Sequence, residues 1–276
     1  MTRPSGDPNP PVRVELRSLE GADSNAAIVS LDRPETLNAI DRSMLDAFAE
    51  VITTVDGNPT VRAMLITGTG RAFSAGGDLK QYLILQRDPV AFPRFVADLH
   101  TTFARLRHLR IPVIALINGV TAAGGLELVL NCDFAVIARS ARIGDAHLNF
   151  GQMGGGGVLT LLPRAVGRAR ANELIFSGRF LDATEAVDWG LASRCVDDDV
   201  LLDTGVDLAA GIAEKSPLAV ANAKQVLHSV WSAGTSVEAG LRVERERNDV
   251  YCLTSHDARE GLEAFSEKRR PRFEGR

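Results

Sequence analysis

Strand-type apolar runs alternate with helical patterns over the first part of the chain, and this alternation restricts the fold more than any other feature. The strand-type runs begin at Val12, Ala26, Ala63, Val113 and Phe134. Between them, residues 41–55 and 92–109 carry apolar side chains at helical spacing. Strands that alternate with helices are typical of a largely parallel sheet, so the sequence predicts an α/β fold.

From about Leu159 onward, one helical pattern follows another to the end of the chain. Ser216 and Pro217 suit the N-cap and the first position of a helix. Thr254 and Asp257 resemble a capping box in front of a last helix. The end of the chain is therefore predicted to be all-helical.

These patterns divide the chain into three expected regions. Residues 1–11 carry four prolines and no apolar stretch, which predicts a disordered tail rather than a signal peptide or a membrane anchor. We place the α/β core at 12–195 and a helical C-terminal region at 196–276. This last region is expected to pack against a neighbouring subunit.

Composition limits the classes of function. Apolar residues make up 45% of the chain and charged residues 24%, as in an ordinary soluble globular protein. The net charge of −4 argues against a nucleic-acid-binding protein, and polar residues interrupt the most apolar region, 111–138, which argues against a membrane span. Cys132, Cys195 and Cys252 have no metal-type spacing and are expected to be reduced thiols of a cytoplasmic protein.

Two loops rich in small residues follow predicted strands. The first reads "GTGRAFSAGGDL", and its backbone N–H groups are accessible because few side chains block the approach, although a tight turn is the alternative. The second opens "NGVTAAGGLELVLNCD", where a helix is predicted to begin near Gly124. The first turn of a helix presents free N–H groups and a positive dipole end. Both loops could therefore bind a negatively charged group.

Glu127 lies in the first turn of that helix and is the strongest candidate for a general base. A surface glutamate that complements the helix dipole is the alternative. The flanking residues are apolar, however, so we expect the carboxylate to be at least half buried. Burial raises the pKa of a carboxyl group, which suits a general base.

A further stretch, "ARIGDAHLNFGQMGGGGVL", contains His147 and a run of four glycines. The run has no following Lys-Ser/Thr and no G-x-G-x-x-G pattern, so it is not a nucleotide phosphate loop. A lone histidine is most often packed with one hydrogen bond, and Asp145 could equally cap a turn. The residues alone leave both a structural and a catalytic role open for His147.

Taken together, these stretches resemble the crotonase superfamily, the enoyl-CoA hydratase/isomerase family. The matching segments, in family order, are "LDRPETLNAID", "RAFSAGGDL", "NGVTAAGGLELVLNCD", "GRFLDATEAVDWGLASRCV" and "DAREGLEAFSEKRRPRF". The resemblance covers nearly the whole chain after the tail. It implies a crotonase-like spiral of ββα units with a helical C-terminal trimerisation region. It also implies coenzyme A thioesters as substrates, no metal or other cofactor, and a homotrimer or hexamer.

The resemblance assigns roles to individual residues. Ala75 and Gly124 match the two positions whose backbone N–H groups form the family's oxyanion hole, where the thioester oxygen gains charge as an enolate develops. We therefore expect both amides to lie about 3 Å from one ligand oxygen. Positions that line coenzyme A in the family correspond to Ala75, Gly76, Gly77, Asp78, Gly124, Phe265 and Lys268.

The resemblance also places His147 at a catalytic position. Glu127 matches the family's first catalytic glutamate, whereas the second belongs in G-x-P-E-x-x-x-G. Here the segment Gly144–Gly151 aligns without a gap and has His147 in place of that glutamate. We expect a hydratase-like lyase with a Glu127/His147 pair. The alternatives are a Δ3,Δ2-enoyl-CoA isomerase, thioester hydrolysis, C–C cleavage, or a degenerate acyl-CoA-binding protein without turnover.

Overall fold

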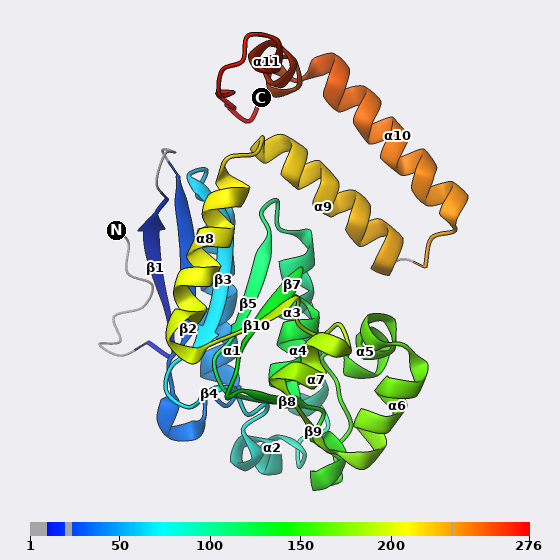
Figure 1. The fold of residues 1–276 in the computed structure, drawn as a ribbon. Helices are drawn as coiled ribbons and strands as arrows, with labels where there is room; N and C mark the ends of the chain where they lie inside the picture. Colours follow the sequence, from blue (N-terminus) through cyan, green and yellow to red (C-terminus); the bar gives the residue numbers. More distant parts are fainter. Residues whose placement is uncertain (1–9, 20–23, 233) are drawn as a thin grey trace.

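The structure is a computed structural model that describes residues 10–19, 24–232 and 234–276 (Figure 1). The predicted tail at 1–11 falls almost entirely outside these described residues. In the described ranges, no helix is both long and apolar enough to cross a membrane.

Within the described residues, the larger of two sheets has six strands in the order β1-β2-β3-β5-β7-β10. Its strands are β1 (Val12–Ser18), β2 (Asn25–Leu31), β3 (Val61–Gly68), β5 (Val113–Ile117), β7 (Phe134–Ala138) and β10 (Arg194–Val196). Strand β1 runs antiparallel to β2, and every other neighbouring pair is parallel. All five strand-type runs of the sequence are confirmed as strands of this sheet, and so is its largely parallel character.

The smaller sheet consists of short strands that the sequence patterns did not reveal. They are β4 (Ala72–Ser74), β6 (Val120–Ala122), β8 (Arg142–Gly144) and β9 (Phe180–Asp182), in the order β4-β6-β8-β9. Strands β4, β6 and β8 are parallel, whereas β9 is antiparallel to β8. Each of the pairs β3–β4, β5–β6 and β7–β8 places its first strand in the large sheet and its second in the small one. This repetition confirms the predicted spiral of ββα units.

Helices surround the two sheets. They are α1 (Arg42–Asp56), α2 (Leu79–Leu85), α3 (Ala91–His108), α4 (Gly124–Leu130), α5 (Val158–Val166), α6 (Arg168–Ser177), α7 (Ala183–Asp188), α8 (Leu201–Ala213), α9 (Pro217–Ser232), α10 (Val237–Thr254) and α11 (His256–Ser266). The described part of the chain also contains the 3-10 turns η1 (Pro34–Thr36), η2 (His147–Phe150) and η3 (Asp198–Val200). Helices α1 and α3 pack together through Phe48 and Phe103, which are buried with their rings edge to face.

The helical C-terminal region has two parts. Helix α8 packs against β3, β5 and β7 of the large sheet, whereas α10 packs against α9 and α11 and lies away from both sheets (Figure 1). Apolar side chains of α9–α11 are exposed in the single chain, namely Leu227, Val230, Val237, Leu241, Val250, Leu253, Leu262 and Phe265. Chemically, this surface suits contact with another protein surface.

One predicted helix start is confirmed and another is wrong. Ser216 accepts a hydrogen bond from the N–H of Ala219 in the first turn of α9, as expected for a cap. Helix α11 is instead capped by Ser255, which accepts from the N–H of Ala258. Asp257 does not cap this helix, because its buried carboxylate accepts the hydroxyl of Ser216 and two amides near the C-terminus.

Helix α9 is fixed to the body by a buried ammonium group. Lys224 donates to the carbonyls of Leu106 and Ile111 at 2.9 and 2.8 Å, and it pairs with Asp133 at 2.7 Å. Its side chain is only 5% exposed, and this burial lowers the pKa of Lys224. The loss of one partner of such a pair is costly because the other groups stay buried without compensation.

Replacing Lys224 with Met should therefore lower the free energy of unfolding by about 3 kcal/mol. The exposed Lys215, whose side chain is 64% exposed beside Glu214, provides the matched control, and Lys215→Met should cost less than about 0.5 kcal/mol. Urea unfolding curves measure both. Equal midpoints for the two variants would show that the buried pair does not hold α9 in place.

Candidate active site

A cavity of about 780 Å³ opens where the three parallel strands of the small sheet end. Its wall includes the segments that directly follow β4, β6 and β8, and these segments contain Gly77, Gly124 and His147 respectively. Ligands of parallel α/β sheets bind at the carboxyl ends of the strands, because successive loops converge there. The topology thus brings together residues that are far apart in the sequence.

Glu127 is buried in the wall of this cavity. Its residue is 1% exposed, and Oε1 accepts the N–H groups of Gly156 at 2.8 Å and of Val158 at 3.2 Å. Burial raises the pKa of Glu127, although the charge of His147 and the two amides act in the opposite direction. The prediction that the carboxylate is buried is confirmed.

The glycine run wraps around this carboxylate. A methyl group added at Gly156 would lie 2.6 Å from Oε2 of Glu127, and one at Gly154 would lie 2.9 Å from Oε1. Only glycine allows the backbone such a close approach, because any Cβ atom would collide with the carboxylate. The glycine run therefore surrounds a carboxylate of the protein itself.

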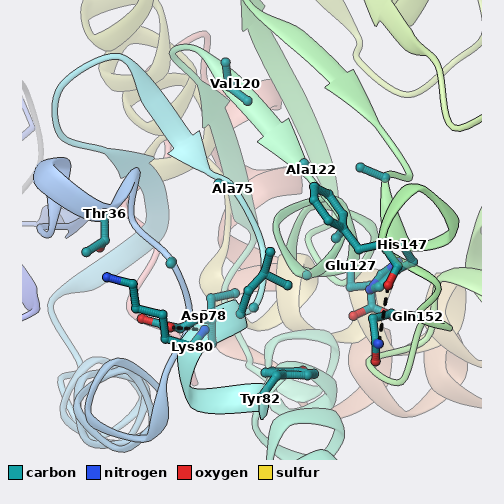
Figure 2. A pocket seen from close by; sticks show the side chains of 18 of the residues that line it. Thr36, Ala75, Asp78, Lys80, Tyr82, Val120, Ala122, Glu127, His147 and Gln152 are labelled. Atoms are coloured by element: carbon teal, nitrogen blue, oxygen red, sulfur yellow. Dashed lines mark hydrogen bonds between the residues drawn. The ribbon is translucent and has the colours of Figure 1, made fainter.

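His147 lies at the start of η2 beside Glu127, as Figure 2 shows. Its Nδ1 atom is 2.5 Å from Oδ1 of Asp145, whose side chain is 1% exposed. Burial alone would lower the pKa of His147, but the hydrogen bond to Asp145 and the charges of Glu127 and Asp145 together raise it. The ring is partnered, as a structural histidine would be, and it also lines the cavity. Sequence reasoning treated Asp145 only as a possible turn cap and missed this contact.

One half of the predicted oxyanion hole is contradicted. The N–H of Ala75 donates to the carbonyl of Leu37 at 2.9 Å and is therefore not available to a ligand. The N–H groups of Gly77 and Gly124, by contrast, have no protein acceptor within the described part of the chain. The nitrogen of Gly77 lies 3.6 Å from the position of a Cβ atom on Gly124, so the two amides are neighbours. Gly77, rather than Ala75, is therefore the candidate partner of Gly124.

The residues expected to line coenzyme A separate into two groups. Ala75, Gly77, Asp78 and Gly124 line the cavity, and Asp78 also caps α2 by accepting the N–H groups of Lys80 and Gln81. Gly76 is buried, is not among the residues that line the cavity, and has a φ of +93°. Phe265, 85% exposed in α11, and Lys268, just beyond that helix, are not among the residues that line the cavity.

Lys80 and Tyr82 are cavity residues that were not predicted from the sequence. Lys80 lines the end of the cavity opposite Glu127, next to Thr36 and Asp78 (Figure 2). Tyr82 packs edge to face against Phe92 and Phe95, and it also lines the cavity. Burial and the charge of Glu127 raise the pKa of Tyr82 to about 12, so its phenol stays protonated at neutral pH. Both residues lie in α2, the helix directly after the first small-residue loop. This helix has too few residues for its pattern to be assigned from the sequence.

Comparisons with known proteins agree with this fold. A model of the enoyl-CoA hydratase/isomerase family matches residues 21–276. A probable enoyl-CoA hydratase of Mycobacterium tuberculosis is 35% identical over 251 residues, which are 91% of this chain and 95% of the relative. The 1,2-epoxyphenylacetyl-CoA isomerase of Escherichia coli is 35% identical over 94% of this chain and 98% of its own.

A solved structure extends the agreement to three dimensions. The crystal structure of an enoyl-CoA hydratase from Bacillus anthracis matches with a TM-score of 0.89 at 31% identity, covering 96% of this chain and 100% of that one. The chain therefore belongs to the enoyl-CoA hydratase/isomerase family. The resemblance identified from the sequence motifs is confirmed.

The raised pKa of Glu127 predicts a pH-dependent effect on stability. The native state binds this proton more tightly than the unfolded chain, so the stabilisation is complete below the unfolded pKa and is lost as pH rises through the native pKa. Glu127→Gln has no such loss. Its melting temperature, relative to the parent, should therefore rise as pH increases from about 4.5 to 8. A difference that stays constant over this range would contradict a native pKa above the unfolded one.

Proposed function

We propose that this protein is an acyl-CoA-processing enzyme, a hydratase-like lyase that adds water to an enoyl thioester through an enolate. One observation carries the proposal: Glu127 and His147 face one cavity whose wall also presents the unpaired amides of Gly77 and Gly124. A base, a proton donor and an oxyanion site are the parts that this reaction needs.

The amides of Gly77 and Gly124 would bind the thioester oxygen. This oxygen becomes negatively charged when a nucleophile attacks the β-carbon, because the electrons of the double bond move toward the carbonyl. Each preorganised donor of this kind typically stabilises the transition state by about 3 kcal/mol. Gly124 lies in the first turn of α4, so the positive end of the helix dipole adds to the effect.

Glu127 and His147 each carry out one of the two proton transfers. Glu127 accepts a proton from water as the water oxygen bonds to the β-carbon. The resulting enolate takes a proton at the α-carbon from His147, and the thioester carbonyl re-forms. Transfer of the proton from Glu127 back to His147 through solvent completes the cycle. The raised pKa of His147 supports this assignment, because it increases the fraction of imidazolium at neutral pH.

This chemistry requires no metal and no cofactor other than the coenzyme A of the substrate. In residues 10–19, 24–232 and 234–276, no three His, Cys, Asp or Glu side chains gather as metal ligands. We assign Asp78 and Lys80, at the opposite end of the cavity from Glu127, to the coenzyme A portion. An ammonium group there suits a phosphate.

We also propose a homotrimer or hexamer in the cytoplasm. The exposed apolar side chains of α9–α11 support an interface between copies. Phe265 and Lys268 would then contact coenzyme A bound to a neighbouring copy, since they do not line the cavity of their own chain. A cytoplasmic location is supported by the absence of a disulfide at Cys132, Cys195 and Cys252.

The second candidate is an isomerase, in which one base moves a proton between the α- and γ-carbons. It is favoured by the histidine at the second-glutamate position and by the relative named 1,2-epoxyphenylacetyl-CoA isomerase. Hydrolysis, C–C cleavage and binding without turnover are distinguished in the same assay by their products. Full activity in His147→Ala, with an unchanged pH profile, would favour the single-base isomerase.

Hydration should depend strongly on Glu127. Glu127→Gln keeps the shape and removes the proton acceptor, so kcat should fall about 10²–10⁴-fold while coenzyme A affinity changes little. The measurement is the loss of enoyl-thioester absorbance with a panel of enoyl-CoA substrates, with Glu50→Gln, at an exposed position of α1, as the control. Activity within about threefold of the parent would remove Glu127 from the mechanism.

The glycine run should matter for turnover as well. Gly156→Ala introduces a methyl group that displaces the Glu127 carboxylate, and a misplacement of about 1 Å can cost about 10²-fold in rate. Gly211→Ala is the matched control, because a methyl group there meets nothing within 4 Å. We expect kcat to fall only in the first variant. Equal rates for both variants would show that the glycine run does not position the base.

A further inference from the structure

We propose that Asp145 is a positioning residue for His147, which fixes the Nδ1–H of the ring and leaves Nε2 as the nitrogen that exchanges the proton. The inference rests on the proposed function for its catalytic consequence. The contact itself does not depend on which reaction the enzyme performs. Asp145 lies outside the residues to which we have given a catalytic or binding role.

The contact is short and buried. Nδ1 of His147 lies 2.5 Å from Oδ1 of Asp145, and the side chains are 14% and 1% exposed. Because Asp145 is a carboxylate that accepts only, Nδ1 must carry the hydrogen. Because Nδ1 donates its hydrogen to Asp145, Nε2 is the ring nitrogen that can exchange a proton with a ligand in the cavity.

Asp145 is also rigidly placed relative to the oxyanion site. It follows β8 directly, and Gly144 at the end of β8 pairs with Ala122 and accepts the N–H of Ala123. Ala123 immediately precedes Gly124. The same strand pairing therefore sets the position of the carboxylate that orients His147 and the position of one oxyanion donor.

The charges around His147 favour its protonated form. Asp145 acts on the ring from the segment after β8 and Glu127 acts on it from α4, while the glycine run that packs nearby contributes no charge. Among the described residues, Oδ2 of Asp145 is buried and accepts no hydrogen bond, so the ring is the only hydrogen-bond partner of this carboxylate. A buried carboxylate in such surroundings is stabilised by a neighbouring cation.

The arrangement defines one proton path. The imidazolium gives the Nε2 proton to the α-carbon, and the neutral ring keeps Nδ1–H bound to Asp145. Nε2 then holds the free electron pair and can take a proton back, so the same atom serves both reaction directions. Without Asp145, the neutral ring could shift its hydrogen to Nε2 and present no acceptor to the cavity.

Asp145→Asn tests this role, because it keeps the shape and removes the charge. Nitrogen-detected NMR titration of His147 should show a pKa at least about one unit lower than in the parent. The alkaline limb of the pH profile of kcat/KM should move by the same amount, and kcat should fall about tenfold or more. Asp257→Asn is the matched control: its carboxylate is equally buried, so the variant should lose stability without moving either value.

The outcomes separate the two proposals. An unchanged pKa of His147 in a folded Asp145→Asn variant would overturn the role of Asp145. If the pKa of His147 shifts in the variant but the parent protein turns over no enoyl-CoA, the positioning role of Asp145 is supported and the proposed function is refuted. If the variant does not fold, the titration of the parent decides alone: a neutral ring with its hydrogen on Nδ1 supports the proposal, and a hydrogen on Nε2 overturns it.

Discussion

The buried carboxylate of Glu127 sets the requirements that the rest of the site meets. An ionised group in a dry environment is costly unless hydrogen bonds and opposite charge compensate for it. Here the amides of Gly156 and Val158 donate to Oε1, and His147 supplies a neighbouring positive charge. These two amides and His147 do not fully offset the effect of burial, so the pKa of Glu127 stays raised. The glycine run and His147 thus both act on this one carboxylate.

The topology explains how these groups meet. In each ββα unit the second strand enters the small sheet, and the loop after it reaches the same edge. The loops after β4, β6 and β8 contribute Gly77, Gly124 and the Asp145–His147 pair. A repeated unit therefore yields three different chemical parts, namely a loop amide, a helix N-terminus and an oriented imidazole.

Much of the fold could be predicted because the spacing of apolar residues along the chain indicates which side chains are buried. The strand-type runs and Glu127 in an apolar first turn were assigned correctly for this reason. The strands of the small sheet have three residues each, too few for a pattern. Ala75 was assigned to the oxyanion hole from the family motif, and the hydrogen bond that its N–H donates to Leu37 is a long-range contact that no local pattern reveals. The same holds for Asp257, whose partners are Ser216 and the C-terminal backbone.

The central claim is that one thioester binds with its oxygen on two amides and its reacting carbons between Glu127 and His147. A crystal structure with a bound, non-reactive acyl-CoA analogue tests it most directly. We predict the thioester oxygen at about 3 Å from the nitrogens of both Gly77 and Gly124, with the α-carbon facing His147. A thioester oxygen bound elsewhere, or an acyl chain directed away from Glu127, would contradict the account.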